Sequence, residues 1–475
     1  MSMMGETDPK AAFQVIVLGP TGGPREDSVT GILVRSTSTK WSSNSVVAVD
    51  AGTLLAGIIR LLEGYIPECK DDQGIMTSGP FQGLELPYRT AQANAAHVFR
   101  EIIGAVLITH PHLDHISGLA INTPILEAGN GPKPVAALPS VLSAIKNHMF
   151  NDVIWPNLSD EDGGAGLLTY QRLVEGGNPR FGRGESRGHG RCKQRYHPES
   201  GTHHRVGSTV FSDHQLMLPS RAISVDHTDS FYSPARSPRL LPSNKEPMMA
   251  TVESSAFFLR DHHTGCEIIV FGDVEPDSVS MGTHNKRVWE TAASKIAMGK
   301  LRAIFIECSY NDSTDDSYLY GHMCPRHLVS ELSVLANRVV EVRDSNTGMK
   351  KRKREPVGPS SSEQVSPRNL SSVDKDRTSE SLIEPPLHPS ESFEIPQIPR
   401  VDFGDILENP DPETWADTTP LPLEGLRVYI IHIKENLTDG PHPGEQILKE
   451  LQDHGEAAHL GCEFFIPNPL EGIWI

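Results

Sequence analysis

The stretch AVLITHPHLDH, residues 105–115, carries the strongest structural signal in this chain of 475 residues. Its first five residues are mostly apolar, which is typical of a buried strand. The next six have the form H-x-H-x-D-H, and imidazole and carboxylate groups are ligands of zinc, manganese and iron. Alternate side chains of an extended segment point the same way, so His110 and His112 face one ion. The following turn can direct Asp114 and His115 towards a second ion.

Such a motif is half of a metal site, and later strands must supply further ligands. Three polar residues lie within or at the end of apolar strands, namely His227 after AISVD, Asp273 after IIVFG, and His432 within VYIIHI. We therefore expect a site with two metal ions. The expected ligands are His110, His112 and His227 for one ion, Asp114, His115 and His432 for the other, and Asp273 as the bridge.

Short apolar strands, each followed by a polar cluster, run along the chain before strands begin to alternate with helices. Strands are predicted at residues 13–18, 31–35, 46–50, 105–109, 255–260, 268–272, 303–307 and 427–433, with one more ending at 224–225. Helices are predicted at residues 53–65, 325–340 and near 445–454. This order favours an α+β fold, an αββα sandwich of two packed sheets flanked by helices, over a single doubly wound sheet. Strand ends in such a fold converge on one rim, where the polar clusters would meet.

The composition narrows the function and the compartment. The formal net charge is −18, so a long nucleic-acid substrate is disfavoured, whereas a small anion held by metal ions is compatible. The six cysteines form no C-x-x-C pair, which favours reduced thiols in a cytoplasmic protein. We expect no signal peptide and no membrane span, because neither an apolar N-terminal core nor a sufficiently long apolar stretch is present.

A single domain over residues 1–475 is expected, with two insertions. Residues 175–205 are rich in glycine, arginine and histidine. Residues 344–399 are rich in serine, proline and charge, so we expect them to be disordered. Within the second insertion, Lys350–Arg354 is a basic run that fits either a nuclear-import signal or a solvated charged loop.

The stretch THPHLDHISGLAINTP, residues 109–124, resembles the signature of the class II, fungal-type 3′,5′-cyclic-nucleotide phosphodiesterases. That signature usually has serine where this chain has Thr123. Further similar segments are FNDVIWPNLS, ESSAFFLRD, FGDVEPDS, IECSY with LYGHMCPRHLVSEL, and IIHIKENL. The resemblance implies the metallo-β-lactamase fold and hydrolysis of cAMP, and often cGMP, to the 5′-monophosphate, which attenuates cAMP signalling. It also implies two divalent ions, usually zinc, with manganese or iron as alternatives.

The resemblance also implies a role for one histidine outside the ligand set, and the chemistry of the proposed reaction suggests roles for other residues. A histidine after the bridging aspartate helps the leaving group to depart, and the matching residue is His322, which Glu307 could orient. Asp114 would orient the nucleophile as well as bind metal. Asp50, at the end of VVAVD, could fix the tautomer of a ligand histidine. Trp155 and Asn157 are candidates for contact with the base.

Three other functions stay open at this point. An RNA-processing nuclease of the same fold would usually carry a basic surface, which this acidic chain lacks outside the run at Lys350–Arg354. A thioester or lactam hydrolase fits less well with FGDVEPDS and the Gly321-His322 pair. A non-catalytic signalling scaffold would not need all seven expected metal ligands. Both a monomer and a homodimer are compatible with the sequence.

Overall fold

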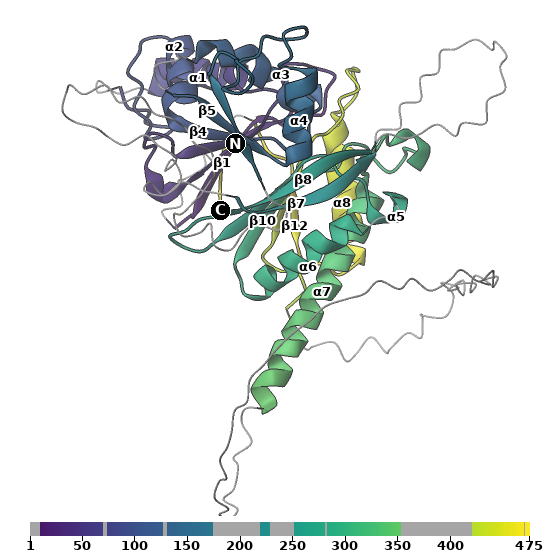
Figure 1. Ribbon diagram of the computed structural model, residues 1–475. Helices are drawn as coiled ribbons and strands as arrows, with labels where there is room; N and C mark the ends of the chain where they lie inside the picture. Colours follow the sequence, from purple (N-terminus) through teal and green to yellow (C-terminus); the bar gives the residue numbers. More distant parts are fainter. Residues whose placement is uncertain are drawn as a thin grey trace, which may run out of the picture. The chain divides into compact units, whose positions relative to one another are not determined.

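The computed structural model describes residues 10–69, 74–126, 131–173, 219–228, 251–280, 283–352, 420–469 and 471–475 (Figure 1). The side chains of residues 66–69, 219–228, 251 and 347–352 lie outside this description. Residues 1–347 and 421–475 form one compact unit, and residues 348–420 form a second. The fold described below is that of the first unit. The insertion expected at residues 175–205 lies outside the described residues.

The first sheet has seven strands in the order β13-β1-β2-β3-β4-β5-β6. Their bounds are β1 (Phe13–Gly19), β2 (Gly31–Ser36), β3 (Val46–Ala51), β4 (Ile103–Leu107), β5 (Lys133–Ala137), β6 (Leu168–Arg172) and β13 (Gly472–Trp474). Strands β13, β1, β2 and β3 pair antiparallel, whereas β3 to β6 pair parallel. Parallel neighbours need crossover connections, which helices supply here. These are α1 (Leu55–Cys69), α2 (Ala91–His97) with the π-helical turn η2 (Val98–Ile102), α3 (Leu113–Asn122) with the short turn η3 (Thr123–Ile125), and α4 (Pro139–His148).

The second sheet has six strands in the order β12-β11-β10-β9-β8-β7. Their bounds are β7 (Pro219–Thr228), β8 (Thr251–Arg260), β9 (Glu267–Phe271), β10 (Leu301–Glu307), β11 (Arg427–Ile431) and β12 (Glu463–Phe465). Strands β7, β8 and β9 form an antiparallel meander, and β9 to β12 pair parallel. The helices after β9, β10 and β11 are α5 (Asp277–Ser280) with α6 (His284–Ala297), α7 (Pro325–Arg352) and α8 (Pro443–Ala457).

The central strands β9 and β10 of the second sheet are buried on both faces, because their apolar residues alternate between two cores. In β10, Ala303 and Phe305 belong to the core between the sheets, whereas Ile304 and Ile306 belong to the core beneath α6, α7 and α8. Successive side chains of a strand point to opposite faces, so an unbroken apolar run such as AIFI fits a covered sheet. The layers are therefore helix, sheet, sheet and helix, which confirms the predicted αββα sandwich (Figure 1).

Several element bounds differ from the sequence-based expectation, and two of these differences concern the end of a strand and of a helix. The strand predicted to reach residue 433 ends at Ile431, because His432 adopts a left-handed backbone with φ of 59°. Helix α7 continues to Arg352, so the expectation of disorder from Asp344 is wrong for residues 344–352. The next proline is Pro356, so no helix-breaking ring interrupts α7 before its observed end. The rest of the segment to residue 399 lies outside the described residues.

The carboxyl ends of five strands meet at one rim of the sandwich. Strands β3, β4, β9, β10 and β11 each end just before or at a residue that the sequence analysis singled out. This convergence brings together side chains from distant parts of the sequence. No helix in the described part of the chain has the length and hydropathy of a membrane span.

Candidate metal centre

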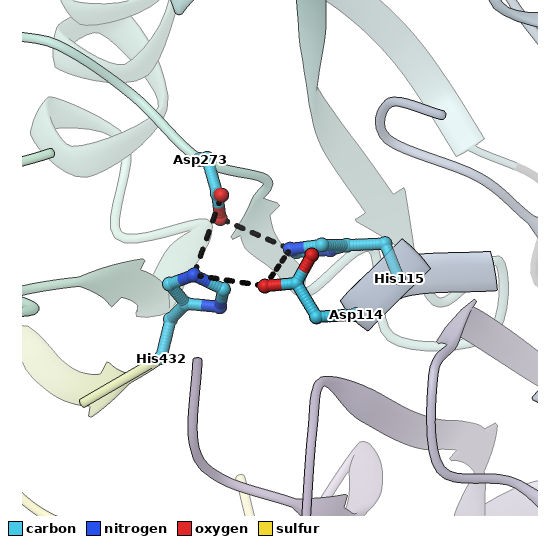
Figure 2. A group of neighbouring side chains, drawn as sticks. All are labelled: Asp114, His115, Asp273 and His432. Carbon is cyan, nitrogen blue, oxygen red and sulfur yellow. Dashed lines mark ion pairs between the residues drawn. The ribbon is translucent and has the colours of Figure 1, made fainter. Parts of the chain in front are cut away.

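Four side chains meet at the rim, as Figure 2 shows: Asp114, His115, Asp273 and His432. Asp273 lies 3.2 Å from His115 Nε2 through Oδ1, and 3.3 Å from His432 Nε2 through Oδ2. Asp114 Oδ2 lies 3.9 Å from His115 Nε2 and 3.6 Å from His432 Nε2. These distances bring two imidazoles and two carboxylates around one point.

Asp273 also belongs to two further groups of potential ligands. His110 and His112 form the first with it, since His110 Nε2 lies 2.9 Å from His112 Nδ1 and 3.5 Å from Asp273 Oδ2. Glu307 and His322 form the second, with His322 Nδ1 3.8 Å from Asp273 Oδ2. Three clusters thus share a single carboxylate, which is the arrangement expected of a bridging residue.

Unusual backbone conformations at this rim direct two of these side chains. Asp50 and His432 both adopt left-handed conformations, with φ of 57° and 59°. Such conformations are uncommon outside glycine and concentrate at functional sites. A Cβ built on Gly22 would lie 2.5 Å from His432 Nε2, so only glycine lets this loop approach the imidazole.

Hydrogen bonds behind the cluster decide which nitrogen of each histidine faces inwards. His115 Nδ1 lies 2.8 Å from Asp50 Oδ2, and a carboxylate can only accept, so this nitrogen carries the hydrogen. The Thr109 hydroxyl donates to the same carboxylate at 2.8 Å and therefore accepts from His110 Nδ1 at 3.0 Å. One carboxylate thus sets the tautomer of two histidines, directly and through a hydroxyl.

The imidazole of His432 is oriented by Thr30, which lies just before β2. The Thr30 hydroxyl donates to the carbonyl of Thr21 at 3.4 Å and lies 2.8 Å from His432 Nδ1, from which it accepts. His432 Nε2 is left with its lone pair towards the cluster and accepts from Lys434 Nζ at 3.2 Å. In the neutral form of His110, His115 and His432, the inward nitrogen is therefore the one that carries no hydrogen.

This concentration of acceptors fits a divalent metal ion. His115 Nε2 is buried and has no hydrogen-bond partner among the described residues. It nevertheless lies 3.2 Å from Asp273 Oδ1, and when His115 is neutral both atoms present lone pairs, which repel unless a proton or a metal cation lies between them. Imidazole nitrogen and carboxylate oxygen are the donor set preferred by zinc and related divalent ions.

The pKa shifts of the clustered side chains also favour a positive charge at this position. Burial opposes a charge on His115, but the carboxylates of Asp273, Asp50 and Asp114 together raise the pKa of its imidazole well above the ordinary value. At His110, burial and the neighbouring imidazole of His115 lower the pKa well below the ordinary value. Burial alone would raise the pKa of Asp273, yet the surrounding imidazoles hold it well below its usual range. Positive charge is thus drawn to the space between His115 and Asp273.

The pair of His322 and Glu307 forms a separate hydrogen-bonded unit beside the cluster. His322 Nδ1 lies 2.9 Å from Glu307 Oε2, so that nitrogen carries the hydrogen. Glu307 is itself fixed by the amide of Val274 at 2.6 Å and by the hydroxyl of Ser309 at 2.6 Å. These hydrogen bonds fix the orientation of the Glu307 carboxylate, which in turn fixes the orientation of the His322 ring.

Other residues singled out from the sequence lie further out. The backbone of His227 pairs with Val252 across β7 and β8, and its side chain is outside the described residues. Trp155 is partly buried and packs against the hydrophobic core that surrounds the first sheet. The amide of Asn157 accepts from the Ser159 hydroxyl at 2.7 Å and donates to the carbonyl of Glu161 at 3.0 Å, within its own loop. Contact of Trp155 or Asn157 with a base stays a prediction.

Three residues of the centre were not anticipated from the sequence: Thr30, Thr109 and Lys434. Lys434 donates to the carbonyl of Gly22 at 2.7 Å and lies 3.8 Å from Asp114 Oδ2. Its position two residues after a ligand histidine is a signal that could have identified it, because alternate residues of an extended segment share a direction. Single hydroxyl groups such as Thr30 carry no comparable pattern.

Among the described residues, the centre is partly exposed at His112, Asp114 and Lys434. His110, His115, Asp273 and His432 are buried, whereas the side chains of Asp114 and Lys434 are each 25% exposed. A small anion can therefore reach the centre from the side of Asp114 and Lys434.

Comparison with known proteins identifies the family. The family model described as cAMP phosphodiesterases class-II matches residues 13–177 and 207–353. A 3′,5′-cyclic-nucleotide phosphodiesterase of Schizosaccharomyces pombe (strain 972 / ATCC 24843) is 28% identical over 328 residues, which cover 69% of this chain and 76% of that protein. A probable 3′,5′-cyclic-nucleotide phosphodiesterase of Yersinia pestis is 26% identical over 330 residues, covering 68% and 73%.

A solved structure supports the fold. The crystal structure of unliganded yeast PDE1 matches with a TM-score of 0.60 at 20% identity, covering 98% of this chain and 100% of that one. Its similarity extends over both sheets and confirms the architecture expected from the sequence. With the family model matching more than half of its residues, this chain belongs to the class-II cAMP phosphodiesterases.

Proposed function

We propose that this chain hydrolyses the cyclic phosphodiester of cAMP, and of cGMP as a second substrate, to the 5′-monophosphate. The observation that carries the proposal is the meeting of three ligand clusters at Asp273, in a chain of the class-II cAMP phosphodiesterase family. The relatives from Schizosaccharomyces pombe and Yersinia pestis bear the corresponding names. The opening beside Asp114 and Lys434 suits a small anion.

Two divalent ions, which we propose to be zinc, would be held by the clusters. The proposed ligands are His110, His112 and His227 for one ion, Asp114, His115 and His432 for the other, and Asp273 between them. Ions bound there would lower the pKa of a water molecule and polarise a phosphoryl oxygen. Asp50, Thr109 and Thr30 would support this chemistry by keeping the inward nitrogens unprotonated.

The chain's own residues would then handle the substrate and the proton. Asp114, with its carboxylate at the open side, would orient the attacking water. Lys434 Nζ, held by the carbonyl of Gly22, would donate to a non-bridging phosphate oxygen. His322, whose Nδ1 hydrogen is directed at Glu307, would donate a proton from Nε2 to the departing 3′ oxygen.

We further propose that the protein acts in the cytoplasm and attenuates cAMP signalling. Among the described residues Cys266, Cys308, Cys324 and Cys462 are free, which fits a reducing compartment. The run Lys350–Arg354 leaves nuclear import as an additional destination to examine by localising the full chain.

The decisive experiment is cAMP hydrolysis by the purified full chain, with metal content measured on the same sample. We expect 5′-AMP as the product and about two metal ions per chain. An Asp114→Ala variant should lose turnover while remaining folded. If the folded, metal-loaded protein leaves cAMP and cGMP intact, the proposal fails. In that case pre-tRNA and a chromogenic lactam, assayed in parallel, report the two other hydrolase functions.

A further inference from the structure

A second pocket lies at the opposite end of the first sheet from the metal centre. Strand β2 begins beside Thr30, which contacts His432, and ends at Ser36, roughly 17 Å further along the strand. At that end the structure has a pocket of about 680 Å³, lined by residues of the β2 end and by Lys40, Trp41, His263 and Trp474. This volume is that of a small-molecule site.

The pocket is lined by basic side chains, although the chain as a whole is acidic. The chain has a net charge of −18, yet the described ionisable side chains that line the pocket are Lys10, Arg35, Lys40 and His263. An adjoining pocket of about 490 Å³ shares Lys10 and adds Lys300, Arg302 and Arg427. A concentration of cations on an acidic protein attracts anions locally.

Arg35 is the most informative residue of this pocket. Its side chain is 5% exposed, and its guanidinium lies 4.0 Å from the ring centre of Trp41 and 6.0 Å from that of Trp474. Nε donates to Gln14 Oε1 at 2.7 Å and Nη1 to the Ser36 carbonyl at 3.5 Å, so both acceptors are neutral. Within the described part of the chain, Nη2 donates to no partner.

A buried guanidinium without a carboxylate is costly, because burial penalises charge that nothing compensates. Burial lowers the pKa of Arg35 to about 10. The carboxylate of Asp261 lies nearby but is already engaged, since it accepts from the Ser36 hydroxyl at 2.9 Å and from the Thr264 amide at 2.8 Å. An anion in the pocket would supply the missing countercharge.

The backbone beside the pocket is also unusual. Lys40 and Trp41 are consecutive and both left-handed, with φ of 49° and 60°. For lysine and tryptophan this conformation is unfavourable, and such residues concentrate at ligand sites. Here it places the Trp41 ring against Arg35 and the Lys40 side chain, which is exposed, at the pocket wall.

We propose that this pocket binds a small molecule that carries a phosphate group, with Arg35 Nη2 and Lys40 contacting the phosphate. Guanidinium and ammonium groups are the side chains that recognise phosphate. The pocket is separate from the metal centre, so this binding does not depend on the proposed hydrolysis.

The test is calorimetric titration of the full chain, as purified, with inorganic phosphate, 5′-AMP and adenosine. To separate this pocket from the metal centre, each titration is repeated on Asp114→Asn. Lys40→Gln removes an exposed cation of the pocket, and Arg35→Gln removes the buried one. Lys286→Gln, an exposed lysine on α6, is the matched control for the loss of one charge.

We expect phosphate and 5′-AMP to bind in the Asp114→Asn background, and adenosine not to bind. Lys40→Gln should weaken this binding about tenfold, and Lys286→Gln should not change it, with cAMP turnover unaffected in both. Because Arg35→Gln can fail to fold, Lys40→Gln decides the matter. The proposal is wrong if neither phosphate nor 5′-AMP binds at millimolar concentration. It is also wrong if adenosine binds equally well, or if Lys40→Gln and Lys286→Gln bind alike.

Discussion

Asp50 sets the tautomer of two histidines, although it contacts only one of them directly. Its Oδ2 accepts from His115 Nδ1 and from the Thr109 hydroxyl, which in turn accepts from His110 Nδ1. We predict that Asp50→Asn lowers the affinity for metal about 10- to 100-fold, because an amide can donate and so permits the wrong tautomers. Metal content after dialysis against graded chelator measures this affinity.

A matched control for Asp50→Asn is Asp261→Asn. Asp261 is a buried carboxylate that also accepts from hydroxyl groups, those of Ser36 and Thr264, but it lies at the other end of the sheet. This variant should be destabilised without any change in metal affinity. Equal metal loss in both variants would mean that Asp50 acts through stability alone.

His322 is predicted to matter for the leaving group. Replacing it with glutamine should lower kcat for cAMP by about 10²–10⁴-fold, since the proton for the departing oxygen is lost. With bis(p-nitrophenyl) phosphate, whose leaving group departs without a proton, the loss should largely disappear. Steady-state kinetics on both substrates check this, and an equal loss on both would assign His322 to the metal centre instead.

Residues of the centre that lie close together in the sequence could be predicted, whereas residues from distant segments were harder to identify. His110, His112, Asp114 and His115 lie within six residues and after an apolar strand, so one motif identifies them. Asp273 and Glu307 follow strands of obvious pattern, and the structure brings both into the clusters. Thr30 could not be placed, because its role depends on which strand ends meet in space, whereas Lys434 could have been found from its position two residues after His432.

At the scale of elements, β5 depends on a buried lysine at its start. Lys133 is 6% exposed, and its Nζ donates to the carbonyls of Arg100, at the end of η2, and of Ile103. Such carbonyls at a helix end need donors. Burial lowers the pKa of Lys133 from 10.5 to about 8, so the folded chain loses this proton before the unfolded chain does.

The sign of the resulting pH dependence follows from proton counting. Between pH 8 and pH 10.5 the unfolded chain binds more protons at Lys133, so stability rises with pH in this window. We predict a rise of up to about 3 kcal/mol relative to Lys133→Met, measured by denaturant unfolding at both pH values. Lys449→Met, an exposed lysine on α8, should follow the original chain.

Several elements with clear periodicity were predicted, whereas α6 and the short elements between prolines were not. The strands β1, β2, β3 and β10 and the helices α1 and α8 lie where their apolar patterns predict them. No element is predicted between residues 125 and 173, where the structure has β5, α4 and β6. Pro134 and Pro139 divide that stretch into apolar runs too short to distinguish a strand from a helix.

Across the whole molecule, the last residues of the chain tie the two sheets together. Strand β12 belongs to the second sheet, whereas β13 pairs with β1 of the first. Ile475 accepts from the Phe13 amide at 2.9 Å and donates back to Phe13 at 3.0 Å. Arg427, at the start of β11, donates to the carbonyl of Trp474 at 2.9 Å.

Removing residues 472–475 should therefore destabilise the whole fold. The loss includes these backbone hydrogen bonds and the buried side chain of Ile475, so we predict roughly 3 kcal/mol or more. Thermal unfolding measures the change. Glu471→Ala, which leaves β13 intact and alters an exposed side chain, is the control and should unfold like the original chain.

The contact between Thr30 and His432 joins residues that are 402 positions apart in the chain. At roughly 5–20 residues per second, a ribosome needs about 20–80 seconds to pass from one to the other. During that interval the motif at His110 is already exposed while the rest of its ligands have not been made. On the proposed ligand assignment, the metal ion held by His432 can therefore meet its full set of ligands only when synthesis is nearly finished.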